Sequence, residues 1–307
     1  MTVETRADTA VLVATYRRPD KLAKLMESLA QCRAFIDFDI IVADNDPGST
    51  TPLAARTNWP TGLSIKVVLE PRPGIAAARN RLLDEAKEYP RLVFVDDDET
   101  VDPDWLQRLI EAQKVSGAGM ITGPIFYTYP AETPPWAILG NFMMADMRDE
   151  SRMVSAASTN NLLIQSQALY DPITLRFDEK FGLTGGSDIM LTRRFTQAGG
   201  LIFFEKTARV HEEIPPERAN ARWFIKRAFR AGNTDARVQL ALDNRIAAHV
   251  RVFGLGFLRL WAGVALLVTH PYINQSATGA KALRMIIRGT GYLYAAAGQA
   301  YSEYNRK

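Results

Sequence analysis

Residues 92–100 read LVFVDDDET, so three adjacent carboxylates directly follow a short apolar run. The apolar residues are mostly β-branched or aromatic, which is typical of a buried strand. Adjacent aspartates repel one another, and a divalent cation such as Mg²⁺ or Mn²⁺ neutralises them best. Because ligands of α/β folds bind at the carboxyl ends of strands, we predict a metal–phosphate site there. The alternative is a solvated acidic turn in which Asp98 or Asp102 caps the next helix.

The order of strand and then helix repeats along the first part of the chain. Pro19 suits the first turn of a helix, and Gly199-Gly200 suits the end of one. We expect strands at residues 10–14, 38–43, 64–69, 92–95, 120–126, 158–164, 201–204 and 208–210, and helices at residues 19–31, from 75, at 103–115 and from about 188. This alternation predicts an α/β fold with a mostly parallel central sheet flanked by helices.

Residues 127–153 interrupt this pattern with several prolines and with Met143, Met144 and Met147. A long irregular segment in a compact domain is often a lid or a binding loop. Methionine-rich surfaces adapt to apolar partners, which fits that interpretation. The alternative is a patch of the core that is filled by methionine under a long loop.

Charge is unevenly distributed along the 307 residues, although the formal net charge is only +3. Residues 216–307 hold 14 Lys or Arg against 4 Asp or Glu. The same segment is rich in Leu, Val, Phe and Trp, which favours an anionic membrane surface over nucleic acid as its partner. The single cysteine, Cys32, excludes an internal disulfide, and the polar first residues predict no secretory signal.

Residues 216–307 are expected to be helical throughout. Residues 222–230 place basic side chains on one arc of a helix and apolar side chains on the other. Residues 252–268 are almost all apolar, but they contain Arg259 and three glycines. A central arginine is costly inside a bilayer, so we expect helices that lie in the membrane interface rather than cross it.

Six short motifs now stand in a fixed order along about 230 residues. They are VATYRRP at 13–19, VADN at 42–45, GIAAARN at 74–80, FVDDD at 94–98, GGSD at 185–188 and VHE at 210–212. In this ordered set the sequence resembles the inverting family-2 glycosyltransferases, which have the A-type nucleotide-diphospho-sugar transferase fold. It is most similar to bacterial exopolysaccharide enzymes of the succinoglycan type, which are β-glucosyltransferases acting on lipid-linked acceptors.

The resemblance implies a donor pocket for a uridine nucleotide. Asp44 would accept a hydrogen bond from the base, and Gly74 would let the backbone approach the nucleotide. Arg79 would face the base or the diphosphate, whose oxygens suit its planar fork. The remaining donor-binding residues implied are Thr15, Tyr16, Arg17, Asn45, Asp96 and Asp97. The structural alternatives are an Asx turn at Asp44 and a surface helix position for Arg79.

The resemblance also implies the metal ligands and the catalytic base. Asp98 would bind Mn²⁺ or Mg²⁺ directly, with Asp96 near the ribose or a metal-bound water. His211 would be a third ligand, although a single histidine is equally consistent with a structural role. Asp188 would take the proton of the acceptor hydroxyl in a single displacement. Its alternative role is to cap a helix, and Ser187 stands where many relatives have an acidic residue.

These expectations give a two-domain protein. Residues 1–215 would form the nucleotide-sugar-binding and catalytic domain, and residues 216–307 a basic, apolar helical extension. The enzyme would move a glucose-type sugar from a UDP-sugar to a polyprenyl-diphosphate-linked oligosaccharide. It would lie at the cytoplasmic face of the inner membrane, as a peripheral or monotopic protein.

Two other functions remain open from the sequence. The chain could be a catalytically silent protein that binds nucleotide sugars, with the chemistry lost at Ser187. Residues 96–100 also fit the Asp-x-Asp-x-Thr motif of haloacid-dehalogenase-like phosphatases, although Glu99 replaces the usual glycine. A dinucleotide-binding dehydrogenase is disfavoured because no Gly-x-Gly-x-x-Gly follows the first strand.

Overall fold

The computed structural model describes residues 7–48, 53, 59–144, 150–171, 173–182 and 184–301. The chain divides into two compact units. The sheet unit comprises residues 1–126, 146–182 and 187–212, and the helical unit comprises residues 127–145, 183–186 and 213–307. The helical unit therefore combines residues 213–307 with two segments that lie earlier in the chain, and the expected division into domains at residue 215 stays a prediction.

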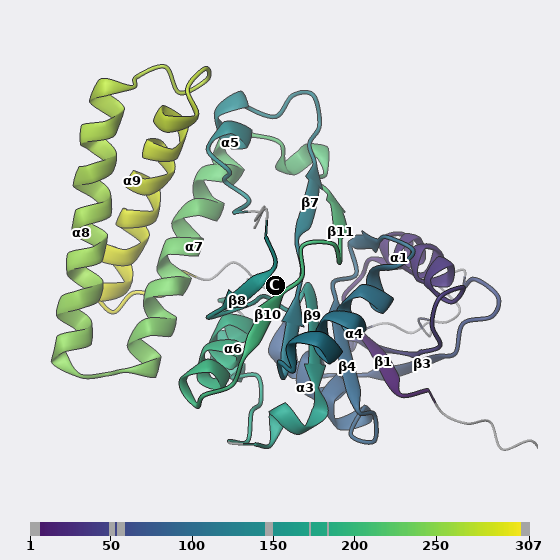
Figure 1. The fold of residues 1–307 in the computed structure, drawn as a ribbon. Helices are drawn as coiled ribbons and strands as arrows, with labels where there is room; N and C mark the ends of the chain where they lie inside the picture. The colour runs from purple at the N-terminus through teal and green to yellow at the C-terminus, as the bar shows by residue number, and fades with distance from the viewer. Residues whose placement is uncertain are drawn as a thin grey trace, which may run out of the picture. The chain divides into compact units, whose positions relative to one another are not determined.

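The sheet unit is built on an eight-stranded sheet with the order β3-β2-β1-β4-β9-β6-β10-β8. Parallel pairs join β1 to β2 and β4, β2 to β3, and β6 to β10, whereas β9 and β8 run antiparallel to their neighbours. The strands are β1 (Thr9–Thr15), β2 (Asp39–Asp44), β3 (Ile65–Leu69), β4 (Arg91–Val95), β6 (Met120–Thr122), β8 (Arg152–Val154), β9 (Asn161–Gln165) and β10 (Ile202–Phe204). The predicted α/β fold with a mostly parallel sheet is confirmed (Figure 1).

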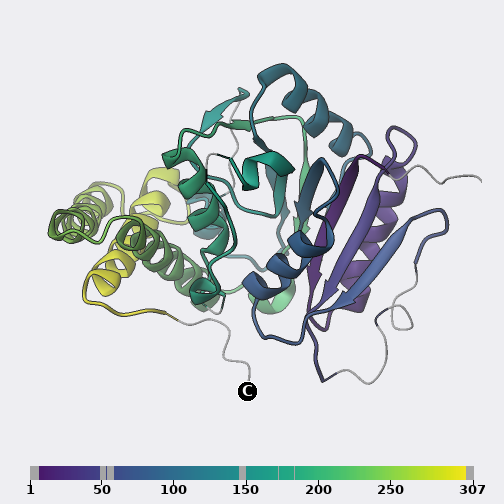
Figure 2. The ribbon, with the colours of Figure 1, turned by 90° about the horizontal axis from the view of Figure 1, so that it is seen from below.

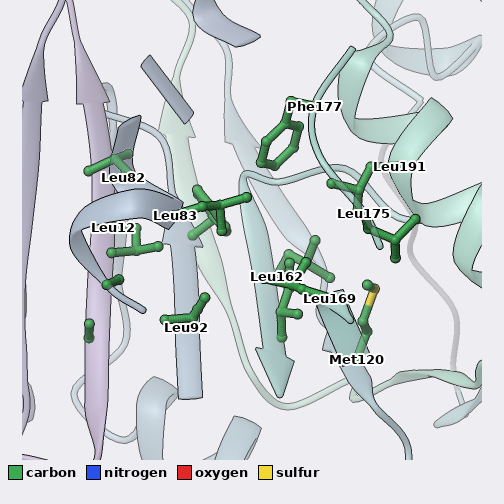
Figure 3. Packing of buried hydrophobic residues seen from close by; sticks show 14 of the residues in the cluster. Leu12, Leu82, Leu83, Leu92, Met120, Leu162, Leu169, Leu175, Phe177 and Leu191 are labelled. Atoms are coloured by element: carbon green, nitrogen blue, oxygen red, sulfur yellow. The ribbon is translucent and has the colours of Figure 1, made fainter. Parts of the chain in front are cut away.

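Helices cover both faces of this sheet (Figure 2). They are α1 (Pro19–Cys32), α3 (Ile75–Glu85), α4 (Trp105–Ser116) and α6 (Ser187–Gln197), with short 3₁₀ turns η1 (Ser166–Leu169) and η2 (Glu179–Phe181). Alternate residues of β1 enter different cores: Leu12 packs with α3 and α6, and Val13 packs with α1 and α4. Figure 3 shows the first core, where Leu82 and Leu83 of α3 approach Leu12. A strand buried on both faces reads as a continuous apolar run, which explains the sequence of β1.

One expected strand divides in two. Residues 120–126 form β6 and the start of β7 (Ile125–Thr128), which belong to different sheets. Gly123 lies so close to another segment that an added Cβ would be 2.2 Å from the carbonyl oxygen of Ala208. Pro124 follows and cannot donate a ladder hydrogen bond, so the sheet cannot continue there. β7 joins β5 (Glu99–Val101) and β11 (Val210–Glu213) in a small second sheet.

The helical unit contains α5 (Pro135–Leu139), η3 (Pro216–Arg218), α7 (Ala221–Leu242), α8 (Ile246–Thr269) and α9 (Ala277–Ala296). The expectation of a helical tail is therefore confirmed, while residues 127–144 supply α5 to the same unit. Met143 is buried beside the aromatic rings of Trp136 and Phe224, and Met144 is partly exposed. Met147 lies outside the described residues.

Glycines let α9 pack closely against α7 and α8. An added Cβ at Gly291 would be 2.2 Å from the carbonyl oxygen of Phe229 on α7. At Gly256 of α8, it would be 2.9 Å from Cβ of Tyr292 on α9. Small residues at such crossings are common between membrane helices, although soluble bundles use them too. Within the described part of the chain, α8 alone is long and apolar enough to cross a membrane.

Candidate active site

The three aspartates form a tight turn between β4 and β5. The backbone N–H of Glu99 donates to the Asp96 carbonyl at 3.3 Å, and the Glu99 carboxyl accepts from the Asp96 N–H at 2.9 Å. The side chain of Asp96 is 40% exposed, whereas those of Asp97 and Asp98 are 7% and 11% exposed. Asp96 is therefore the most exposed of the three carboxylates, and Asp97 is the least exposed.

Asp97 and Asp98 are held by the last residue of β1 and by the loop that follows it. Thr15 Oγ1 donates to Asp97 at 2.7 Å, and Arg18 donates to Asp97 at 3.1 Å and to Asp98 at 2.9 Å. β1 and β4 are parallel neighbours, so the loops that follow them meet at one edge of the sheet. Burial and the charge of Asp98 raise the pKa of Asp97 to about 6, although Arg18 and Thr15 oppose this shift.

Asp96 faces α3 and α6. Arg79 of α3 is buried and donates to Asp96 Oδ1 at 3.1 Å, with its guanidinium 5.8 Å from the ring centre of Phe177. Desolvation by the surrounding protein raises the pKa of Asp96, and the negative charges of Asp98 and Asp188 raise it further. The positive charge and the hydrogen bond of Arg79 lower it in part. Arg79 is thus a buried residue of α3 and not at the surface helix position that was its alternative.

Asp188 lies in the first turn of α6, directly after the buried Ser187. Its Oδ1 accepts a hydrogen bond from the N–H of Ile189 at 2.8 Å. Asp188 therefore lies inside the first turn of α6 and not at the N-cap position, which was the alternative interpretation. Its other oxygen has no hydrogen-bond partner within the described residues, so the same carboxylate can also serve an acceptor.

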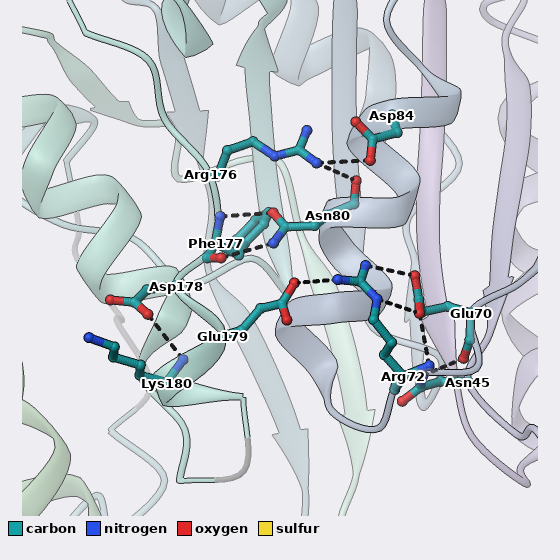
Figure 4. Close-up of polar contacts among 10 residues, drawn as sticks. All are labelled: Asn45, Glu70, Arg72, Asn80, Asp84, Arg176, Phe177, Asp178, Glu179 and Lys180. Carbon is teal, nitrogen blue, oxygen red and sulfur yellow. Dashed lines mark hydrogen bonds and ion pairs between the residues drawn. The ribbon is translucent and has the colours of Figure 1, made fainter.

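The loop after β2 is built around Asn45 (Figure 4). Its side-chain amide donates to the carbonyls of Glu70 and Arg72 at 2.8 and 2.7 Å, and its oxygen accepts from the N–H of Gly74 at 3.1 Å. Gly74 has a φ of 117°, which only glycine adopts without strain, and it directly precedes α3. The side chain of Asn45 therefore shapes the expected donor pocket by binding the backbone of Glu70, Arg72 and Gly74.

The other residues expected to bind the donor lie nearby in the chain. Asp44 is buried, and its Oδ1 accepts from the N–H of Asp46 at 3.1 Å, which is the Asx turn that was the alternative interpretation. Arg17 has a left-handed backbone with a φ of 55°, and its Nε donates to Asp46 at 3.1 Å. Its guanidinium lies 5.0 Å from the ring centre of Tyr16. Arg17 thus links the loops that follow β1 and β2.

His211 on β11 is paired with Asp102, with 2.8 Å between Nε2 and Oδ1. Its ring also lies against Phe126. Among the described residues, no three Asp, Glu, His or Cys side chains are arranged to hold a metal ion by themselves. Carboxylates such as Asp96 and Asp98 nevertheless fit Mg²⁺ or Mn²⁺, which typically bind one or two of them together with substrate phosphates.

Three residues of this edge were not selected from the sequence. Arg18 and Lys21 neutralise Asp98, with Lys21 Nζ 3.6 Å from Oδ2. Glu99 is buried, and one of its oxygens has no hydrogen-bond partner in the described residues. Burial and the charge of Asp96 raise its pKa well above the ordinary value. Arg18 follows the selected Arg17 directly, and no pattern in the sequence distinguishes the two.

The solved structures most relevant to this arrangement share its fold. The Staphylococcus aureus TarS fragment 1–349 in complex with UDP has a TM-score of 0.53 at 16% identity, covering 95% of this chain and 92% of that one. GalNAc-T7 with UDP, GalNAc and Mn²⁺ also gives 0.53, at 15% identity, and covers 76% and 51% of the two chains. The fold of the chain is that of an A-type glycosyltransferase.

Sequence comparison assigns the family. The profile described as "Glycosyl transferase family 2" matches residues 10–171, which is more than half of the chain. The chain is 35% identical over 229 residues to "Succinoglycan biosynthesis protein ExoM" of Rhizobium meliloti (strain 1021), covering 74% of this chain and 73% of the relative. It is 24% identical over 272 residues to "Glycosyltransferase AglE" of Haloferax volcanii, covering 87% of this chain and 84% of the relative.

The chain belongs to glycosyl transferase family 2 and is a glycosyltransferase. The expected family resemblance is thus confirmed. This assignment argues against the phosphatase interpretation of residues 96–100, since the same residues belong to the matched transferase region.

Proposed function

We propose that this glycosyltransferase moves a glucose-type sugar from a UDP-sugar to a lipid-linked oligosaccharide, with inversion at the anomeric carbon. The observation that carries the proposal is the pairing of Asp96 with the buried Arg79 at the end of β4, together with Asp188 in the first turn of α6, whose charge raises the pKa of Asp96. It combines a carboxylate for a metal and phosphate site, a cation for phosphate oxygens and a second carboxylate for proton transfer. The UDP complex of TarS and the UDP and Mn²⁺ complex of GalNAc-T7 support the donor class.

The donor would bind along the loops that follow β1, β2 and β4. Asp44 accepts from the uracil, and Gly74 lets the backbone approach the nucleotide beside Asn45. Asp98 and Asp96 would hold Mn²⁺ or Mg²⁺, which neutralises the diphosphate of the leaving nucleotide. Arg79 donates to phosphate oxygens from a side chain that is already fixed by burial.

Asp188 would act as the general base. Its carboxylate takes the proton from the acceptor hydroxyl while that oxygen forms a bond to the anomeric carbon. The bond from this carbon to the phosphate oxygen breaks, and UDP leaves with the electron pair. Attack from the face opposite to UDP converts an α-linked donor into a β-linked product. The main requirement of this step is a general base within hydrogen-bond reach of the acceptor hydroxyl.

The helical unit would hold the enzyme at the cytoplasmic face of the inner membrane. The outer face of α8, defined as Phe253, Phe257, Leu258, Trp261, Leu266 and Val268, is exposed within this unit. Arg259 does not lie on this face, because its guanidinium is 4.3 Å from the ring centre of Tyr292 on α9. The costly central charge is therefore turned toward α9, and an apolar face remains for the acyl chains.

Replacing Asp188 by Asn tests the proposed reaction. We expect transfer from UDP-glucose to a lipid-linked oligosaccharide to fall by about 10²- to 10⁴-fold, because the base is lost. UDP affinity measured calorimetrically with Mn²⁺ should stay within about twofold of the parent, since the base does not hold the nucleotide.

Asp178→Asn is the matched control. Asp178 also accepts from a backbone N–H at the start of a helical turn, that of Lys180 at 3.0 Å. Its variant should keep full activity. Retained turnover in Asp188→Asn would exclude Asp188 as the base. Donor binding by the parent without turnover of any UDP-sugar would instead favour the silent binding protein.

A further inference from the structure

Arg18 places a positive charge directly on the proposed metal-binding carboxylates. One nitrogen of its guanidinium, Nη1, lies 3.1 Å from Asp97 Oδ1 and 2.9 Å from Asp98 Oδ2. Lys21 adds a second, more distant positive charge, 3.6 Å from the same oxygen of Asp98. Arg18 thus neutralises the same carboxylates that a divalent ion would neutralise. An arginine and a divalent ion cannot both contact that Asp98 oxygen at short range without strong repulsion.

The two arginines of the site differ in how firmly they are held. The side chain of Arg79 is 9% exposed and lies against Phe177, so moving it would disrupt packing. The side chain of Arg18 is 38% exposed. Its guanidinium therefore has room to move, but the carboxylates that it would leave are nearly buried, so Arg18 is released only when another cation takes its place. Arg79 is a fixed part of the site, and Arg18 is a releasable one.

The backbone around Arg18 favours such a release. Arg18 directly precedes α1, and its carbonyl accepts from the N–H of Leu22 at 3.0 Å. Pro19 fixes the first turn of the helix, so the backbone stays in place while the long side chain changes rotamer. The side chain would then remain at the edge of the sheet where the donor's diphosphate is expected. A guanidinium matches phosphate oxygens with two parallel hydrogen bonds.

We propose that Arg18 is a positioning residue that competes with the divalent metal for Asp98 and transfers to the donor's diphosphate when metal and UDP-sugar bind together. The inference rests on the metal-dependent function proposed above. It makes the metal and the nucleotide bind cooperatively, because the nucleotide gives the displaced guanidinium a new partner. By linkage, each ligand then raises the affinity of the other by the same factor.

The experiment is a titration of Mn²⁺ into the full-length protein, followed by the electron paramagnetic resonance signal of the free ion. It is done without and with saturating UDP, for the parent and for Arg18→Gln. Without UDP, Arg18→Gln should bind Mn²⁺ at least about fivefold more tightly, since the competing cation is gone. The factor by which UDP strengthens Mn²⁺ binding should fall by a similar amount.

Two further variants make the result specific. Arg108→Gln removes an arginine of α4 whose Nε lies 2.7 Å from Asp104 Oδ2. It should leave the affinity for Mn²⁺ unchanged, both without and with UDP. Arg18→Lys keeps the charge but loses the planar fork, so its Mn²⁺ affinity without UDP should lie between those of the parent and Arg18→Gln. It also serves as the test if Arg18→Gln melts at a clearly lower temperature than the parent.

Three outcomes would overturn the proposal. Unchanged or weaker Mn²⁺ binding by both Arg18 variants would exclude competition and leave the proposed function intact. Equal tightening in Arg108→Gln would show a general effect of charge and not a contact at Asp98. If the parent bound no Mn²⁺ with or without UDP, the metal-dependent function would fail, and this inference would fail with it.

Discussion

The edge of the sheet after β4 and the outer face of α8 differ in the side chains that they carry: charged ones cluster at the first, and apolar ones cover the second. In the sheet unit, three carboxylates are gathered at one turn and are neutralised by Arg18, Lys21 and Arg79. In the helical unit, Arg259 is turned toward Tyr292 of α9, so that the exposed side of α8 carries only apolar side chains from Phe253 to Val268.

The difference shows which chemistry each unit is suited to. Gathered carboxylates cost free energy unless a cation binds them, so the edge after β4 is prepared for charged ligands. An exposed apolar face costs free energy in water, so the outer face of α8 is prepared for a nonpolar environment. The two features differ in that Arg18, Lys21 and Arg79 already neutralise the carboxylates after β4, whereas the apolar face of α8 is exposed.

The largest expected effect is at the end of β4. Asp98→Ala should reduce the affinity for UDP in the presence of Mn²⁺ by at least roughly 100-fold, since even a supporting partner of a metal ligand contributes about 10- to 100-fold. Calorimetry with and without Mn²⁺ measures this, and the two affinities of the variant should become equal. Asp104→Ala, which removes a carboxylate that pairs with Arg108, should behave like the parent. Undiminished Mn²⁺-dependent binding in Asp98→Ala would exclude it as a ligand.

An intermediate effect is expected on α8. Phe257 is 50% exposed, so Phe257→Lys should fold and should weaken binding to vesicles that contain anionic lipid by roughly tenfold, which is the effect of losing about half of a buried phenylalanine. Sedimentation with vesicles measures it. Val115→Lys is the control, because Val115 is an exposed apolar residue of α4 in the sheet unit. Equal binding by Phe257→Lys and the parent would show that this face does not enter the bilayer.

The smallest expected effect concerns Glu70, which supports the loop beside Asn45. Burial favours its neutral form, but three hydrogen bonds from Arg72 lower its pKa below the ordinary value of 4.5. A lowered carboxyl pKa stabilises the protein above 4.5, and this stabilisation is lost as the pH falls through the folded-state pKa. Glu70→Gln should therefore lower the free energy of unfolding by about 1 kcal/mol at pH 7, because Arg72 is largely exposed.

Urea denaturation at pH 7 and at pH 4 measures this difference, which should shrink at the lower pH. Glu179→Gln is the matched control, since Glu179 pairs with the same arginine at 2.9 Å but is half exposed. It should leave the stability unchanged. A difference for Glu70→Gln that does not vary with pH would show that its charge contributes nothing.

Much of the fold was predictable because neighbouring residues decide it. The apolar runs of β1 and β4 and the proline at the start of α1 carry their own local signals. The end of β6 was not located, because it depends on how closely Gly123 approaches the carbonyl of Ala208. The antiparallel direction of β9 was likewise not foreseen, since a buried strand reads the same in both directions.

At the candidate site, the sequence predicted which residues to consider, but it did not predict their hydrogen-bond and ion-pair partners. The family motifs indicate Asp96, Arg79 and Asp188, and in the structure Arg79 donates to Asp96 at 3.1 Å while the charge of Asp188 raises the pKa of Asp96. The roles assigned to them stay predictions. His211 was expected near the metal, and in the structure its imidazole is paired with Asp102, a contact that the sequence alone did not suggest.

By itself, the sequence determined that strands and helices alternate, that carboxylates end a buried strand and that the last third is helical and basic. These properties follow from local propensity, periodicity and composition. Only the tertiary structure decided that Arg18 neutralises Asp98, 80 positions away in the chain, and that Arg259 faces Tyr292. The physical reason is that strand pairing and helix packing choose the partners of a long charged side chain, and no local pattern records that choice.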